Sequence, residues 1–181
     1  TVILSPCGIL GYGFPEKSLW DAMEQHPDAI IVDAGSTDAG PHKLGAGVAI
    51  VSRKAAKIDL SRLMHAAHGA GIPLLIGSAG GSGARKHTDW TLDIIEEIAR
   101  EMNWKARFAV ISADIPYEDI RRARGEGRIE KMSPNVPDLT DEALEKTNGV
   151  VAQMGVEPIL KALEQKPDIV LCGRAYDPAP F

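Results

Sequence analysis

Short β-forming runs that alternate with amphipathic helical segments constrain the fold of this chain more than any other feature. We expect strands at residues 1–4, 29–33, 72–76, 106–112 and 168–172, and helices at residues 16–25, 55–70, 88–102, 117–124, 158–165 and from Thr140 onward. Strand–helix units of this length favour parallel pairing with right-handed crossovers. The pattern therefore predicts a doubly wound, mostly parallel α/β sheet with helices on both faces, a Rossmann-like fold.

Length and charge narrow the class of protein. A chain of 181 residues predicts a single domain. The net charge of −5, with scattered basic residues, argues against nucleic-acid and membrane partners. No apolar run approaches the roughly 20 residues that span a bilayer. No signal-peptide pattern is visible and Cys7 and Cys172 form no disulfide framework, so we expect a cytoplasmic protein.

The last residues, 179–181, follow a strand and a turn where a doubly wound domain would place another helix. We therefore expect the chain to be the N-terminal part of a longer protein, or one subunit of a split one. A homo-oligomer, or a complex with the missing C-terminal part, is the expected assembly.

Glycine-rich and polar stretches of the chain come directly after the expected strands. Ligands of open parallel sheets bind outside the carboxyl ends of the strands, so five turns at that edge predict one small-molecule site. The predicted substrate- or anion-binding residues are Gly8, Ser36, Thr37, Ser78, Gly80, Gly81, Gly83, Arg85, His87, Asp114, Arg174 and Asp177.

The turn at residues 77–83 has the clearest physical interpretation. Its glycines allow close approach of the backbone to a ligand, and the helix expected from Thr88 directs free N–H groups at the same place. With Arg85 and Lys86 nearby, we expect an anion there: a phosphate, a pyrophosphate or a carboxylate. The alternative is that the glycines only permit tight turns. Neither G-x-G-x-x-G nor a P-loop pattern is present, so NAD is not expected.

The turn after residues 29–33 supplies the acid–base candidates, which are Asp33, Asp38 and His42. Asp33 could instead only cap the turn, or hold a divalent metal together with Asp38. Asp-x-Gly-Ser-Thr also occurs in the phosphate-binding hairpin of actin-like ATPases. Here it follows a continuously apolar run, typical of a strand buried on both faces, so ATP chemistry is a lesser alternative.

Other chemically capable residues have simpler explanations. His65 and His68 share a helix face, but they lack further metal ligands nearby, so we expect an exposed or hydrogen-bonded pair. Packing is favoured over nucleophilic chemistry for both cysteines. Arg174 and Asp177 have either an ion-pair partner or a ligand, and the ligand is favoured.

Six ordered motifs resemble the acyclic terpene utilisation family AtuA: residues 6–14, 33–38, 76–81, 89–91, 154–158 and 173–177. The resemblance implies a longer protein in a catabolic cluster alongside acyl-CoA enzymes. Tyr176, Pro178 and Pro180 depart from the family pattern, whereas Arg174 and Asp177 keep to it. No catalytic residue carries over from the family.

Together these features predict a catabolic enzyme that acts on a small carboxylate or acyl-CoA-like substrate by non-redox acid–base chemistry, of lyase, hydratase or hydrolase type. The rival interpretation is a non-catalytic ligand-binding or partner subunit of a larger catabolic complex. An ATP-using enzyme is a third.

Overall fold

A parallel β-sheet forms the centre of the computed structural model, which describes residues 1–36 and 40–181. The strands described are β1 (Ile3–Leu4), β2 (Ala29–Asp33), β3 (Leu74–Gly77), β4 (Phe108–Ile111) and β5 (Ile169–Cys172). Their order is β1-β2-β3-β5-β4, and every pairing is parallel. The prediction of a doubly wound α/β fold is confirmed.

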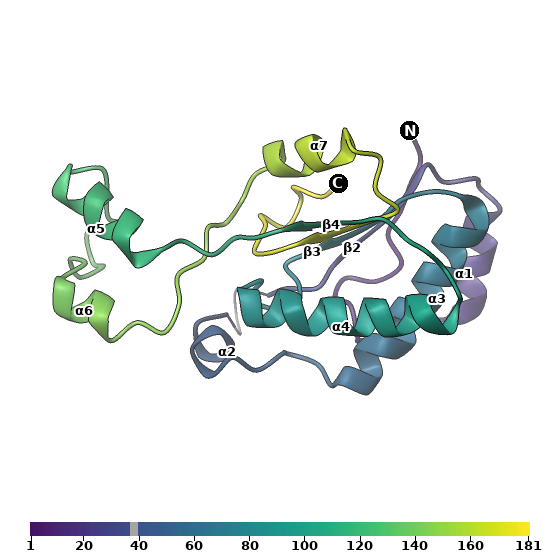
Figure 1. The fold of residues 1–181 in the computed structure, drawn as a ribbon, viewed down its shortest axis with the longest axis horizontal. Helices are drawn as coiled ribbons and strands as arrows, with labels where there is room; N and C mark the ends of the chain where they lie inside the picture. Colours follow the sequence, from purple (N-terminus) through teal and green to yellow (C-terminus); the bar gives the residue numbers. More distant parts are fainter. Residues whose placement is uncertain (37–39) are drawn as a thin grey trace.

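Helices cover both faces of the sheet (Figure 1). The helices α1 (Glu16–Met23), α3 (Arg53–Ala70) and α4 (Arg85–Glu101) lie on one face, and α7 (Glu157–Leu163) lies on the other. From β1 to β4 the chain advances across the sheet in one direction, and from β4 to β5 it returns. Because such crossovers are right-handed, the reversal transfers α7 to the opposite face. The sheet thus has a switch point between β3 and β5.

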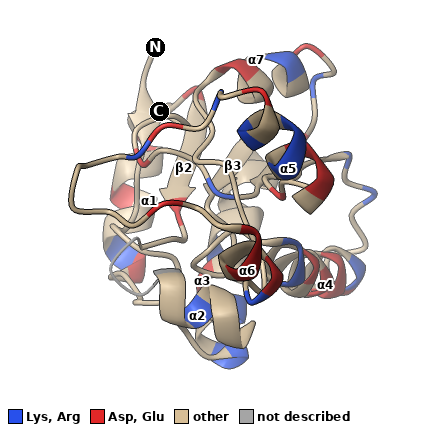
Figure 2. Ribbon diagram, turned by 90° about the vertical axis from the view of Figure 1, so that its left-hand side faces the viewer, with Lys and Arg blue, Asp and Glu red and all other residues tan. Residues whose placement is uncertain are grey.

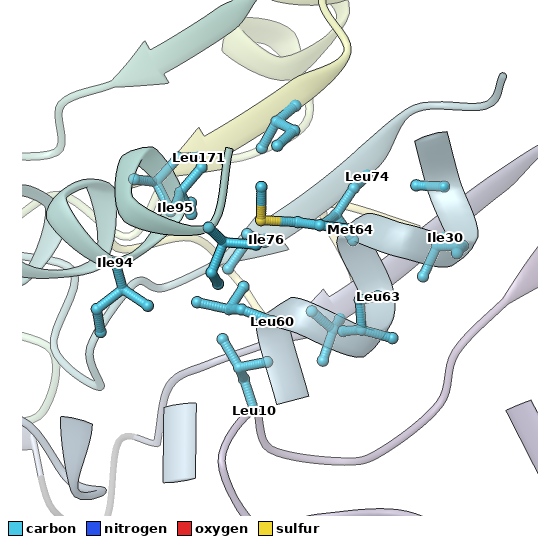
Figure 3. Packing of buried hydrophobic residues seen from close by; sticks show 14 of the residues in the cluster. Leu10, Ile30, Leu60, Leu63, Met64, Leu74, Ile76, Ile94, Ile95 and Leu171 are labelled. Atoms are coloured by element: carbon cyan, nitrogen blue, oxygen red, sulfur yellow. The ribbon is translucent and has the colours of Figure 1, made fainter. Parts of the chain in front are cut away.

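The alternation of side chains along each strand separates two apolar cores. Ile30, Leu74 and Ile76 point into the larger core, where they pack with residues of α3 and α4 (Figure 3). Their neighbours Ile31 and Leu75 point into a smaller core against α7. The central strands are therefore buried on both faces, as their continuous apolar runs predict.

Helix α4 begins at Arg85, three residues before the predicted start at Thr88, and Ala84 is its N-cap. Thr88 is buried inside the first turns, and its hydroxyl donates to the carbonyl of Arg85 at 2.8 Å. A threonine that bonds backward within a helix needs no capping position. As a result, Arg85 and His87 belong to the first turn of α4 and not to the preceding loop.

Helix α2 (Gly40–Ala46) occupies a stretch where only a turn was expected. His42 therefore lies on a helix. Beyond the sheet stand α5 (Tyr117–Gly125) and α6 (Asp141–Glu145). A helix was predicted from Thr140, and Thr140 is the N-cap of α6. Figure 2 looks onto this end of the molecule, with α2, α5 and α6 in front of the carboxyl ends of the strands. No helix of the described residues is long and apolar enough to cross a membrane.

Candidate functional site

The turns after β2, β3 and β5 pack against one another at the switch point of the sheet. A Cβ atom on Gly35 would collide with the side chain of Ser78, and one on Gly83 would collide with the backbone nitrogen of Arg174. Glycine is required at both positions because one turn lies directly against the next. The expected convergence of these three turns is present, and part of the glycine content serves that packing.

The turn at residues 77–83 is also bonded internally. The N–H groups of Gly81 and Gly83 donate to the carbonyls of Ser78 and Ala79 at 3.1 and 3.0 Å. Ser78 has a φ of 48°, and its hydroxyl both donates to the carbonyl and accepts from the N–H of Ala175, at 3.2 Å each. The N–H groups of Gly81 and Gly83 are thus engaged within the turn and are not free for the predicted anion.

Arg174 is the charged residue at the centre of the switch point, and it is only 5% exposed. Its guanidinium forms an ion pair with the exposed Asp177 at 3.2 Å, and it donates to the carbonyl of Gly81 at 3.5 Å. Of the two alternatives left open by the sequence, the ion pair is therefore present. Among the described residues, the side chain of Arg174 bonds to one carbonyl and one exposed carboxylate, and a guanidinium has five N–H donors in all.

Asp33 ends β2 and is half-buried beside this pair. Burial, above all, raises the pKa of its carboxyl from 3.8 to about 6. The N–H of Gly35 lowers that pKa and the charge of Asp177 raises it, while Arg174 has a smaller lowering effect. Oδ1 of Asp33 is buried and has no hydrogen-bond partner among the described residues. A carboxyl with these properties exchanges a proton near neutral pH.

A largely apolar cavity of about 340 Å³ adjoins Arg174. Its walls include Pro41 and Leu44 from α2, together with Val151, Ser36 and Ser82. A cavity of this size and lining suits a short hydrocarbon chain, with the guanidinium at one side for an anionic or carbonyl end.

A second cavity, of about 470 Å³, lies at the N-terminus of α4. Arg85, Lys86 and His87 line it, opposite Asp114 and Asn148. The arginine is exposed and lies 3.7 Å from Asp89. Asp114 is exposed, and its carboxylate accepts from the hydroxyl of Ser112 at 3.3 Å. Three predicted residues, Arg85, His87 and Asp114, are thus brought together around one space.

Ser82 joins the two cavities, although it is not among the site residues expected from the sequence. It lines the apolar cavity, and its Oγ lies 2.5 Å from Nδ1 of His87, which lines the other. Burial, followed by the charge of Lys86, lowers the pKa of His87, and the carbonyl of Val48 partly offsets this. In the sequence this pair is visible only as a serine in a glycine-rich turn, five residues before a histidine. That pattern is too common to identify a functional residue.

The turn after β1 forms hydrogen bonds with a residue of helix α3. The N–H groups of Gly11 and Gly13 donate to Oδ2 of Asp59, a buried residue, at 2.8 and 3.0 Å. These glycines therefore hold a carboxylate of the protein itself. Gly8, the predicted binding residue of this turn, is exposed, and a Cβ atom there would meet nothing within 4 Å.

Two predicted residues, Thr37 and Asp38, lie outside the described residues. His42 is exposed on α2, and no hydrogen bond or ion pair joins it to Asp33 among the described residues. Of the expected acid–base trio, Asp33 is therefore the residue that the described part of the chain places at the switch point.

The remaining histidines and cysteines agree with their simpler explanations. His65 is exposed with Nδ1 2.7 Å from the carbonyl of Ser61, and the ring of His68 lies 4.5 Å from that of Trp104. Burial raises the pKa of Cys7 to about 11 and of Cys172 to about 12, so neither is a ready thiolate. In the described part of the chain, no three histidine, cysteine or acidic side chains are grouped to hold a metal ion.

The comparisons with known proteins agree with the motif pattern. Residues 53–181 match the sequence model described as acyclic terpene utilisation family protein AtuA. Four of the six motifs lie in that range, and those at residues 6–14 and 33–38 lie before it. No curated protein and no solved structure matches the chain.

Proposed function

The chain belongs to the acyclic terpene utilisation family AtuA, and we propose that it is an enzyme of this catabolism that acts on a carboxylate or acyl-CoA-like substrate by acid–base chemistry. Family membership itself places the chain in acyclic terpene utilisation. The substrate class and the type of reaction are the parts that we propose.

The observation that carries the proposal is a carboxyl with a raised pKa at the same edge of the sheet as a buried guanidinium, which lines an apolar cavity. Asp33 has a pKa of about 6, and Arg174 lines the cavity of about 340 Å³. Asp33 ends β2, and Arg174 follows β5. Because β3 lies between β2 and β5, the two residues lie on either side of the end of β3. Ligands of doubly wound sheets bind at such a switch point.

Substrate binding would use the cavity for the hydrocarbon chain and Arg174 for its polar end. A guanidinium binds a carboxylate through two parallel hydrogen bonds, and it also stabilises negative charge that develops on a thioester carbonyl oxygen. Because Arg174 is almost fully buried, its charge is screened little by water, so either interaction is strong.

The chemical step would use Asp33 to accept or return a proton, because a pKa near the working pH is the most effective for this task. Asp38 and His42 are further acid–base candidates from the sequence. These acid–base residues support two kinds of reaction. One is the removal of a proton next to a carbonyl, and the other is the addition of water to a double bond or an acyl group. These are the lyase, hydratase and hydrolase classes.

The test replaces Asp33 in the natural protein and measures turnover of acyclic isoprenoid acids and their CoA thioesters by mass spectrometry. Asp33→Asn should lower kcat by at least about 100-fold, the scale of general acid–base catalysis. Asp21→Asn, at an exposed aspartate paired with Lys17, is the matched control and should keep full activity. Full activity of the Asp33 variant would overturn the proposal.

A non-catalytic subunit remains the rival. It predicts that the natural protein, purified with any chains that accompany it, binds these substrates without converting them. The intact mass of the natural protein and the identity of copurifying chains distinguish a complete catalyst from a subunit.

A further inference from the structure

A buried serine–histidine pair lies between the turn after β3 and the start of α4, beside the apolar cavity. Ser82 is 3% exposed and lines the cavity of about 340 Å³, and His87 is 2% exposed. Oγ of Ser82 lies 2.5 Å from Nδ1 of His87. The proposed acid–base step gives neither residue a role. A hydroxyl in hydrogen-bond contact with an imidazole is the arrangement of a nucleophile with its general base.

The hydrogen bonds of the pair show which group holds the proton. The N–H of Ser82 donates to Nδ1 at 3.4 Å, so Nδ1 is the unprotonated nitrogen of the ring and the hydroxyl donates to it as well. Burial, followed by the charge of Lys86, lowers the pKa of His87 from its ordinary value of 6.5, and the backbone of Val48 partly offsets this. The ring is therefore neutral at pH 7 and can accept the hydroxyl proton.

The surrounding backbone holds the ring in this position. A Cβ atom on Gly80 would lie 2.7 Å from the Cβ of His87, so the turn packs directly on the histidine. The hydroxyl of Thr91, one helical turn further along α4, donates to the carbonyl of His87 at 2.8 Å. Since the ring is enclosed by packing, the hydroxyl and the imidazole are pre-organised for proton transfer.

A second buried serine in the same turn shows what a purely structural hydroxyl does here. The hydroxyl of Ser78 donates to the carbonyl of Ala175 and accepts from its N–H, at 3.2 Å each, and so joins two turns. The hydroxyl of Ser82 accepts a longer bond of 3.4 Å from the N–H of Ala84, and it donates to a base, the ring of His87. The two serines therefore differ in chemistry, although both are buried.

Arg174 lies next to Ser82 and supplies the charge that acyl transfer requires. Its guanidinium donates to the carbonyl of Gly81 at 3.5 Å, and its N–H donates to the carbonyl of Gly83 at 3.2 Å, so both neighbours of Ser82 in the chain are bonded to it. Ser82 and Arg174 also line the same cavity. A thioester in that cavity would meet a hydroxyl for its carbonyl carbon and a buried positive charge for its carbonyl oxygen.

We propose that Ser82 is the nucleophile of a thioester hydrolase and that His87 is its general base. The proposal rests on the proposed function for the class of substrate, and it selects the hydrolase from the reaction classes named there. The apolar cavity holds the acyl chain, and Arg174 stabilises the negative charge that develops on the carbonyl oxygen.

The reaction has two halves. In the first, Oγ of Ser82 bonds to the acyl carbon while its proton passes to Nδ1 of His87. The carbon–sulfur bond then breaks, and the sulfur leaves with the electron pair and takes the proton from His87. In the second, the oxygen of a water molecule bonds to the acyl carbon, the bond from that carbon to Oγ breaks, and a proton of the water returns to Oγ through His87. The products are a carboxylic acid and a thiol.

The first experiment treats the natural protein with a small alkyl fluorophosphonate, which bonds to an activated serine and releases fluoride. The intact mass should rise by one phosphonyl group, and peptide mapping should place this group on Ser82. His87→Gln should lower the labelling rate at least about 100-fold, the scale of general-base catalysis. Ser112→Ala is the matched control, because Ser112 is an exposed serine bonded to the carboxylate of Asp114, and it should leave the labelling unchanged.

Circular dichroism shows whether His87→Gln is folded, and the mapping of the adduct in the wild-type protein needs no variant. Absence of a phosphonyl group, its attachment to another residue, or a folded His87→Gln that reacts at the wild-type rate would each overturn the inference.

A second experiment separates this inference from the proposed function. During turnover of acyclic isoprenoid CoA thioesters, protein quenched with acid should carry the acyl group on Ser82, and Ser82→Ala should lose at least about 1,000-fold in kcat. If Ser82→Ala keeps full activity while Asp33→Asn loses it, the serine nucleophile is wrong and the proposed function stands. If Ser82 is labelled and required while Asp33→Asn keeps full activity, the serine nucleophile stands and the role of Asp33 is wrong.

Discussion

The replacement of Asp33 by Asn should change the stability of the protein in a pH-dependent way. In the folded protein the pKa of Asp33 is about 6, against 3.8 ordinarily, because burial disfavours the charged carboxylate. Asparagine has nearly the same shape and never ionises. The variant therefore removes the cost of charging the carboxyl without opening a cavity.

The sign of the effect follows from proton linkage. Between pH 3.8 and about 6 the folded protein holds a proton on Asp33 that the unfolded chain releases, so stability falls as the pH rises through this window. Below the window Asp33 is protonated in both states. Above it the folded protein carries the full cost of the buried charge, which is at most about 3 kcal/mol at 1.36 kcal/mol per pKa unit.

The assay is urea unfolding of the wild-type protein and the variant at pH values from 4 to 8. The stability difference between Asp33→Asn and wild type should shift in favour of the variant by about 2–3 kcal/mol from the low to the high end of this range. Asp21→Asn should show a nearly constant difference, because Asp21 is exposed. A difference for the Asp33 variant that does not change with pH would refute the argument from burial.

Three further predictions concern other parts of the molecule. Asp38→Asn should abolish turnover while leaving the circular dichroism and the Tm unchanged, and undiminished activity would remove Asp38 from the acid–base set. Gly83→Ala should lower the free energy of unfolding by more than about 3 kcal/mol, because its methyl group would collide with the backbone of Arg174, whereas Gly125→Ala, with open space around it, should change it by less than about 1 kcal/mol. Cys172 should resist alkylation by iodoacetamide at pH 8 in the native protein and react in urea, since burial raises its thiol pKa to about 12; rapid native labelling would contradict this.

The fold class could be predicted because it depends on local patterns. The continuous apolar run of β2 and the helical periodicity of α3 and α4 are visible in short windows, and handedness rules restrict how such units assemble. The start of α4 could not be predicted in the same way. Thr88 resembles a cap in sequence, but only the packed helix shows that its hydroxyl bonds backward to Arg85.

The location of the candidate site follows from topology, whereas its composition does not. Parallel strands bring their following turns to one edge, so Asp33, Arg174 and the turn at residues 77–83 were expected together. The contact of Ser82 with His87 depends on where one turn ends and α4 begins, which no spacing rule specifies.

The amino-acid sequence by itself determined two features: a parallel α/β sheet, and polar turns at the carboxyl edge of that sheet. Both follow from side-chain periodicity and chain connectivity. Only the tertiary structure decided what each turn does. The glycines after β1 enclose Asp59, Gly35 and Gly83 admit neighbouring backbone, and the raised pKa of Asp33 arises from burial. Each of these depends on atoms distant in sequence that meet only when the sheet is assembled.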